Sequence, residues 1–328
     1  MQAKLYSPTP PHHRRHAGGL RRGGLVALPT ETVYGLAANA LDAQACRAIF
    51  RAKARPANDP LIVHVLDLAQ AEKLAAFSPI ARRLARRFWP GPLTLVLPKK
   101  SCVPAIVTSG GDTVAIRSPA HPLARRVLRL AGVPLAAPSA NLFGYLSPTE
   151  AAHVLDGLGR KIAHILDGGT CAVGVESTIL DLTRPDQPRI LRPGIITPEV
   201  LGKFLGLAIK SPPPLSSGGR IGARLVAPGM MDRHYSPRTP LRIKNSIGPL
   251  PPEIAGVFMR KPANRPPGNV RWLSRRGSLA EVARNLYRVL REIDRAGFEE
   301  IWVEALPADA GGPAAALRDR LKRAAAKR

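Results

Sequence analysis

The most informative feature of the sequence is a regular alternation of short apolar segments with helical patterns, from residue 24 to about residue 205. The apolar segments are aliphatic or β-branched, and Gly, Pro or Ser closes each of them, as is typical of strands. We expect strands at residues 25–28, 61–65, 94–97, 114–117, 134–137, 178–182 and 189–191. The alternation predicts an α/β domain in which helices flank a sheet.

Three helices in this region have recognisable ends. Asp42 is the expected N-cap of a helix that runs to about Lys53, with apolar residues at helical spacing. Ser147 and Glu150 form a capping box, which predicts that another helix starts beside them. A third helix covers residues 80–88 and carries four arginines in a two-wide stripe. That stripe is either an RNA-facing patch or a solvated helix face.

The composition and periodicity of the sequence change between residues 206 and 237. Proline-rich and glycine-rich runs lie close together there with little periodicity, which predicts an extended linker. The last part of the linker also carries Arg233, His234 and Tyr235 together, so it is either a lid over the site or a passive spacer.

A smaller unit is expected after the linker, over residues 238–328. Strand-like segments at 256–259 and 301–304 enclose an amphipathic helical pattern at 279–295, and a basic helix is expected at 314–327. Strand, helix and strand in this order favour a small α/β domain.

Residues 1–19 contain arginines and three histidines among prolines and glycines, with no apolar segment of the kind found in secretory signals. We expect a disordered N-terminal extension. Its histidines offer nitrogen atoms to a metal ion, but a disordered tail is the favoured interpretation.

The chain is strongly basic, with 49 Lys and Arg against 23 Asp and Glu among 328 residues and a formal net charge of +26. Such a charge suits anionic ligands or partners such as nucleotides, pyrophosphate or RNA. A compositional bias toward arginine explains much of the excess as well, so the charge does not choose among these.

The three cysteines are far apart and form no C-x-x-C pair, which argues against a disulfide framework or a structural zinc site and suits a reducing cytoplasm. No apolar run approaches the ~20 residues of a membrane helix, so no membrane partner is expected. The chain also has no P-loop, no G-x-G-x-x-G turn, no G-x-S-x-G elbow and no H-E-x-x-H motif. If ATP is bound, a less common scaffold binds it.

Polar clusters follow several of the expected strands. Two threonines and an acid lie at residues 30–32, after the first strand, where hydroxyls are well placed for a small ligand, although they also satisfy turn backbone. Lys53 and Arg55 lie two apart at a helix end stiffened by prolines, which suits phosphate oxygens. A solvated helix C-terminus attracts cations in the same way. His64, in the middle of a strand, is typical of a hydrogen-bonded core residue.

Taken in order, six segments resemble the YrdC-type threonylcarbamoyl-AMP synthases. They are residues 29–36 (PTETVYGL), Lys53-x-Arg55-Pro56, Arg117-x-Pro119, residues 138–141 (PSAN), Ser177-Thr178 and Arg192-Pro193-Gly194. Residues 227–237 further resemble the linker of the long, two-domain form of that family. The resemblance implies a twisted open sheet with flanking helices over residues 20–205, followed by a small Rossmann-like C-terminal domain.

The resemblance also implies the site residues. Threonine would meet Thr32, His64, Arg117 and Ser177. The nucleotide would meet Lys53, Arg55, Asp59, Thr113, Ser139, Asn141, Ser147 and Arg192, and Tyr235 would close over it. Lys53 and Arg55 would carry the catalysis. Asp59 departs from many relatives, which have Lys or Asn there, so it either points away from the phosphates or holds Mg²⁺.

The implied reaction joins L-threonine, bicarbonate and ATP, with Mg²⁺ on the ATP phosphates. Its product would pass to a downstream tRNA threonylcarbamoyl transferase, and tRNA itself is a further possible partner. A carbamate oxygen is already anionic, so its attack on the α-phosphorus needs positioning and charge neutralisation rather than a general base. A site rich in Arg, Lys, Ser and Thr fits that demand.

Two alternatives share this type of domain. The first is a non-catalytic module that grips double-stranded RNA with its basic cavity; only 5% of residues are aromatic, which argues against single-strand stacking. The second is a hydrogenase-maturation carbamoyltransferase, which also carries zinc fingers, whereas this chain has three scattered cysteines.

Overall fold

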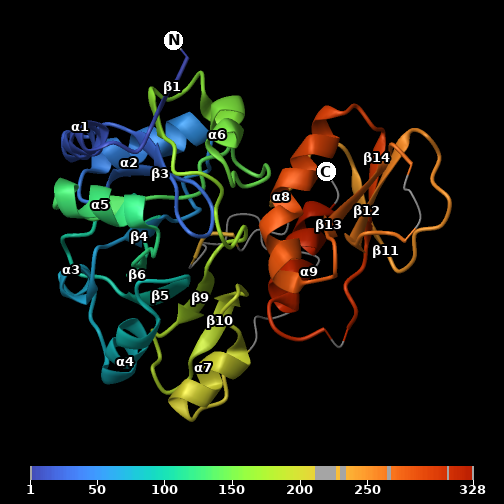
Figure 1. The fold of residues 1–328 in the computed structure, drawn as a ribbon. Coiled ribbons are helices and arrows are strands. Elements are labelled where there is room, and N and C mark those ends of the chain that lie inside the picture. Colours follow the sequence, from blue (N-terminus) through green and yellow to red (C-terminus); the bar gives the residue numbers. More distant parts are fainter. Residues whose placement is uncertain (1, 211–226, 230–233, 264–266, 309, 327–328) are drawn as a thin grey trace.

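The structure is a computed structural model that describes residues 2–210, 227–229, 234–263, 267–308 and 310–326. Most of the predicted linker, including Arg233, therefore lies outside the described residues. No helix in the described ranges is long and apolar enough to cross a membrane. Figure 1 shows two lobes, of which the N-terminal one is the larger.

The larger lobe is built on a mixed sheet. Its strands are β1 (Lys4–Tyr6), β2 (Val26–Leu28), β3 (Gly35–Asn39), β4 (Ile62–His64), β5 (Leu93–Pro98), β6 (Thr113–Arg117), β7 (Leu135–Ala136), β8 (His164–Leu166), β9 (Thr178–Asp181) and β10 (Arg189–Arg192). Within the described part of the chain they form one ten-stranded sheet in the order β1-β8-β2-β3-β7-β4-β6-β5-β9-β10. All seven strands expected in this region are confirmed.

The helices of this lobe are α1 (Pro10–Arg21), α2 (Ala43–Lys53), α3 (Leu68–Glu72), α4 (Pro79–Phe88), α5 (Pro122–Ala131), α6 (Ala151–Leu158) and α7 (Pro198–Leu205). They bury apolar residues against both faces of the sheet. Leu20 of α1 and Val127 of α5 pack with Leu28 in one core, whereas Ile49 of α2 packs with Leu36 in the other. Because successive side chains of a strand point to opposite faces, a buried strand contributes to both cores.

The N-terminal segment is ordered, contrary to the prediction from the sequence. Residues 1–19 were expected to be disordered, but β1 pairs in parallel with β8 at the sheet edge and α1 packs beside it. Some histidines take part in packing here: the rings of His12, His16 and His164 each contact Tyr6, and His16 is buried. Apolar and ring contacts across distant segments therefore order this extension. Among the described residues no group of three metal-binding side chains occurs.

A second correction concerns the start of α6. The N-cap is Glu150 without a side-chain cap, so the capping box expected at Ser147 does not form. The Ser147 hydroxyl donates instead to the buried carboxylate of Glu176, at 2.5 Å. The N-cap of α2 is as predicted, since the Asp42 carboxylate accepts hydrogen bonds from the Gln44 and Ala45 amides.

The smaller lobe confirms the expected Rossmann-like α/β domain. It contains β11 (Leu241–Lys244), β12 (Ile254–Arg260), β13 (Val270–Ser274), α8 (Leu279–Arg295), β14 (Glu300–Glu304) and α9 (Ala314–Ala324). The four strands are parallel, in the order β11-β14-β12-β13. In Figure 1, α8 and α9 lie on the side of this sheet that faces the larger lobe.

Candidate active site

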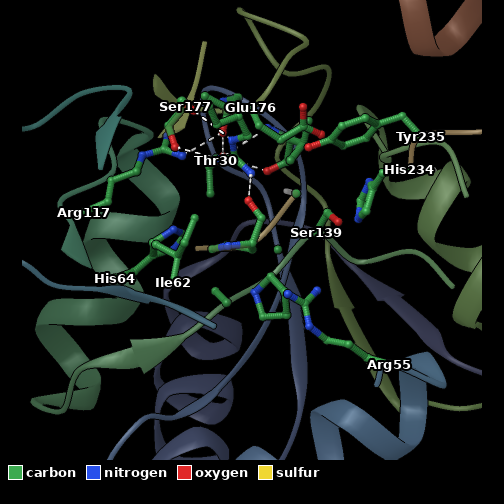
Figure 2. Close-up of a pocket in the computed structure, with 18 residues that line it drawn as sticks. Thr30, Arg55, Ile62, His64, Arg117, Ser139, Glu176, Ser177, His234 and Tyr235 are labelled. Atoms are coloured by element: carbon green, nitrogen blue, oxygen red, sulfur yellow. Dashed lines mark hydrogen bonds between the residues drawn. The ribbon is translucent and has the colours of Figure 1, made fainter. Parts of the chain in front are cut away.

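A cavity lies where β4 and β6 end, beside the segment that follows β2. Eight of the residues predicted for the site line it, namely Thr32, Arg55, His64, Arg117, Ser139, Ser177, Arg192 and Tyr235. Thr30, Val33, Gly35, Glu176, Pro228, Gly229 and His234 are among the other lining residues. Figure 2 shows Arg117, His64 and Ser177 at one end of the cavity and His234 and Tyr235 at the other.

Arg117 is the most firmly fixed group at the first end. It ends β6 and is 3% exposed, and its guanidinium donates to the Thr32 hydroxyl at 2.9 Å and to the Gly91 carbonyl at 3.2 Å. Glu31 pairs with the same guanidinium at 2.6 Å. Thr30 and Thr32 share a hydrogen bond of 2.9 Å. A guanidinium held by three partners is fixed in orientation, and the N–H groups in its plane suit a carboxylate.

Ser177 and His64 complete this end of the cavity. The Ser177 hydroxyl shares a hydrogen bond with Thr94 at 2.8 Å and accepts one from Arg192 at 3.2 Å. Burial, together with the nearby Arg117, lowers the pKa of His64 to about 3. The imidazole is therefore neutral at physiological pH, and it offers one donor and one acceptor rather than a charge.

Arg55 lies at the other end, just after α2. Its guanidinium pairs with Asp59 at 2.9 Å and donates to the carbonyls of Asp59 and Pro60. Both side chains are buried. Asp59 is thus paired with Arg55. The guanidinium offsets the negative charge of this acid near the expected phosphate site.

Lys53 does not lie where the sequence analysis expected it. Its ammonium donates to the backbone carbonyls of Ser139 and Asn141, at 2.5 and 2.6 Å, and the side chain is 1% exposed. Burial and the neighbouring Arg55 lower its pKa well below the usual value, although Asp59 opposes the shift. Lys53 therefore fixes the loop after β7 and does not line the cavity.

Three further predicted residues also lie off the cavity. Thr113 begins β6, four residues before Arg117 and at the opposite end of the strand. Asn141 donates to the carbonyls of Leu142 and Tyr145, and Ser147 donates to Glu176. Their predicted contacts with ATP stay predictions.

The cavity is closed on one side by His234 and Tyr235, which come from the described end of the linker. Both are buried, and their rings lie 4.1 Å apart. Tyr235 has a φ of 59°, in the left-handed region that non-glycine residues seldom adopt. Strained backbone of this kind is concentrated at functional sites.

Known proteins resemble this chain over both of its lobes. Residues 19–194 match the Sua5–YciO–YrdC family, described as telomere recombination, and residues 196–326 match the C-terminal domain of threonylcarbamoyl-AMP synthase. The threonylcarbamoyl-AMP synthase of Pyrococcus abyssi is 42% identical over 95% of this chain and 93% of its own length. That of Bacillus subtilis is 40% identical, covering 98% and 95%. The chain belongs to the two-domain threonylcarbamoyl-AMP synthase family.

The fold agrees with that assignment. The crystal structure of P. abyssi Sua5 complexed with L-threonine superposes with a TM-score of 0.87 at 38% identity, over 98% of each chain. The P. abyssi protein and this chain therefore share the arrangement of lobes seen in Figure 1.

Two acidic residues of this synthase-family site were missed from the sequence. Glu31 holds Arg117, and Glu176 lines the cavity next to Ser177. Glu31 lies between the two threonines of residues 30–32, and Glu176 directly precedes the Ser177-Thr178 motif. The available signal was charge: an acid beside ligand-binding hydroxyls in a basic site needs a cationic partner when it is buried.

Among the described residues, no group of three His, Cys, Asp or Glu side chains beside the cavity could hold a metal ion. The three nearby carboxylates, Glu31, Asp59 and Glu176, are paired with Arg117, Arg55 and Arg320. Oxygen atoms engaged by guanidinium groups are poor ligands for a divalent cation.

Proposed function

We propose that this protein condenses L-threonine, bicarbonate and ATP to threonylcarbamoyl-AMP and pyrophosphate, and is therefore a nucleotidyltransferase. The supporting observation is one cavity that joins two sets of groups. Arg117, Thr32 and Ser177 suit an amino acid, whereas Arg55, Arg192 and Ser139 suit phosphates. The threonine bound to the P. abyssi relative supports the first assignment.

The threonine carboxylate pairs with Arg117 in this proposal, and the hydroxyls of Thr32 and Ser177 lie within the same part of the cavity. Neutral His64 adds a hydrogen bond without adding charge. Because these groups are buried and partly satisfied by one another, an amino acid without the threonine hydroxyl leaves polar atoms unpaired.

Two bonds are made in sequence. The threonine amine attacks bicarbonate, and the resulting carbamate forms with loss of water. A carbamate oxygen then attacks the α-phosphorus of ATP, the bond to the β-phosphate oxygen breaks, and pyrophosphate leaves. Arg55 and Arg192 stabilise the negative charge that develops, so the step depends on position and electrostatics. Mg²⁺ is carried on the ATP phosphates as part of the substrate.

The product is a mixed anhydride that water destroys. We infer that it is handed to a tRNA threonylcarbamoyl transferase in the cytoplasm, where the three free cysteines stay reduced. The buried rings of His234 and Tyr235 exclude water from one side of the cavity.

Double-stranded RNA binding is not favoured by the same cavity. Arg55, Arg117 and Arg192 are 8%, 3% and 4% exposed, and all three line the cavity. A duplex backbone cannot reach guanidinium groups buried to that extent.

Pyrophosphate release tests the proposal. We expect release only when threonine, bicarbonate and ATP are all present, little release with 2-aminobutyrate, and weak release with serine. Equal rates with threonine and 2-aminobutyrate would contradict the threonine assignment. Release without any amino acid would contradict the proposed reaction.

A further inference from the structure

The carboxylate of Glu176 connects the cavity to the C-terminal domain. Arg320 of α9 donates to it at 2.7 Å, and the Tyr287 hydroxyl of α8 donates to it at 3.0 Å. Ser147 donates to its other oxygen. Arg320 is 0% exposed and also lies over the ring of Tyr235, 5.1 Å from its centroid. Two residues of the second lobe thus reach the wall of the first lobe's cavity.

These contacts determine the charge of Glu176. Burial by itself raises the pKa of a carboxyl group, but Arg320, then Arg192 and the hydrogen bond from Ser147, outweigh it and lower the pKa. Glu176 is therefore an anion on the wall of a cavity proposed to bind anions. It is compatible with that role because Arg320 and Tyr287 occupy its oxygen atoms.

The helix that carries Tyr287 is seated on the loop before Glu176. Arg284 donates to the Ala172 carbonyl at 3.0 Å. Gly174 has a φ of +83°, and a Cβ there would lie 2.4 Å from the backbone of Ala283 and Arg284. Helix α8 and this loop therefore approach each other more closely than any residue with a side chain allows.

The same loop is bound to the threonine segment. The Val173 amide donates to the Glu31 carbonyl at 2.8 Å, and the Gly174 amide donates to the Thr32 carbonyl at 3.1 Å. Val33 and Val175 are buried in the apolar core of the C-terminal domain. Val33, which follows Thr32, and Val175, which lies between Gly174 and Glu176, thus share their packing with the second lobe.

We propose that Arg320 and Tyr287 are positioning residues for the threonine pocket, which they control by holding the Glu176 carboxylate against the C-terminal domain. The inference rests on the proposed function. Without Arg320, Glu176 is a buried, underpaired anion beside Ser177. It then pairs with Arg192 or repels the threonine carboxylate and the phosphates. The C-terminal domain is in this view one wall of the active site.

The test uses the full-length protein and measures the Kd of threonine by calorimetry, KM and kcat for threonine by pyrophosphate release, and the thermal midpoint. We expect Arg320→Met to weaken threonine binding by about tenfold to a hundredfold, since a hydrogen bond to a charged group is lost. Tyr287→Phe, which keeps the packing of the ring, should weaken it by about tenfold. Arg288→Met removes an exposed arginine pair, with Glu292 on the same helix, and should leave binding unchanged.

A rescue experiment separates charge from packing. In Arg320→Met combined with Glu176→Gln the unpaired anion is gone, so threonine affinity should recover most of the loss while the thermal midpoint stays low. If Arg320→Met and Tyr287→Phe lower only the midpoint and threonine binds as in the wild type, the inference is wrong and the proposed function stands. If the wild-type protein itself binds no threonine, the proposed function fails.

Discussion

At the scale of single residues, three buried arginines at or beside the site are each paired with a buried acid. Arg55 with Asp59, Arg117 with Glu31 and Arg320 with Glu176 follow this rule. A buried ion pair adds little stability, but removal of one partner destabilises the protein strongly because the other is left as an unpaired, desolvated charge. Such pairs hold a guanidinium in one orientation, which is what phosphoryl and carboxylate recognition requires.

The Arg55 pair allows catalysis to be separated from folding. Arg55→Met should destabilise the protein by about 3–5 kcal/mol, because Asp59 is left unpaired. It should also slow pyrophosphate release by ~10²–10³, since a charge-stabilising donor is lost. Arg55→Met with Asp59→Asn should restore the unfolding free energy but not the rate. A double variant with near-normal turnover would show that Arg55 only holds the fold.

Two buried histidines make stability depend on pH. Burial is the main cause that lowers the pKa of both His64 and His153 to about 3, from the ordinary 6.5. The unfolded chain therefore binds more protons between pH 6.5 and 3, and stability falls as the pH is lowered through that window, by up to about 1.4 kcal/mol per pH unit for each histidine. Above pH 6.5 both histidines are neutral in the folded and the unfolded chain, and they no longer reduce the free energy of unfolding.

His153 tests this without disturbing the cavity. Between pH 7 and pH 5 the urea-unfolding free energy of the wild type should fall by about 2 kcal/mol more than that of His153→Asn. Parallel pH profiles for the two proteins would mean that His153 is protonated as easily in the folded as in the unfolded state.

At the scale of secondary structure, long or strongly patterned elements could be predicted from the sequence. The amphipathic helix expected at 279–295 is α8, and the expected N-cap Asp42 caps α2. Strand β3 was missed because its sequence, GLAAN, has no β-branched residue. Helix α1 was missed because its stability comes from contacts of Leu20 and His16 with segments far away in the sequence.

In the site, too, roles that depend on distant partners could not be predicted from the sequence. Arg117, Ser177 and Arg192 could be predicted because ordered motifs carry them. The roles of Lys53 and Ser147 could not, since their partners are loop carbonyls and Glu176, which only the fold brings near. A sequence motif identifies a residue but not the atom that its side chain meets.

The close packing of α8 against the loop at Gly174 gives a prediction at the scale of secondary structure. Gly174→Ala combines a strained φ with a clash against the backbone of α8, so it should lower stability by more than the ~1–3 kcal/mol of strain alone and weaken threonine binding. Gly132→Ala is the matched control, because its φ of +70° carries the strain while nothing lies within 4 Å of the new Cβ. Similar losses in both variants would show that the approach of α8 does not matter for binding.

At the scale of the whole molecule, the two lobes share one active site. Val33 and Leu146 of the first lobe are buried in the same apolar cluster as Leu286 and Leu317 of the second. A protein cut after residue 210 exposes these side chains and loses Tyr287 and Arg320. We expect it to keep its circular-dichroism signature but to bind threonine at least about tenfold more weakly. Undiminished binding by the folded fragment would show that the second lobe is dispensable for the pocket.

The central claim is that one cavity joins threonine, bicarbonate and the adenylate of ATP. The most direct measurement is mass spectrometry of the products formed from threonine, ATP and carbon-13-labelled bicarbonate. We predict an adenylate that contains threonine and the labelled carbon, formed together with pyrophosphate and absent when any substrate is withheld. If the folded protein binds ATP and threonine but yields no labelled adenylate, the account is wrong.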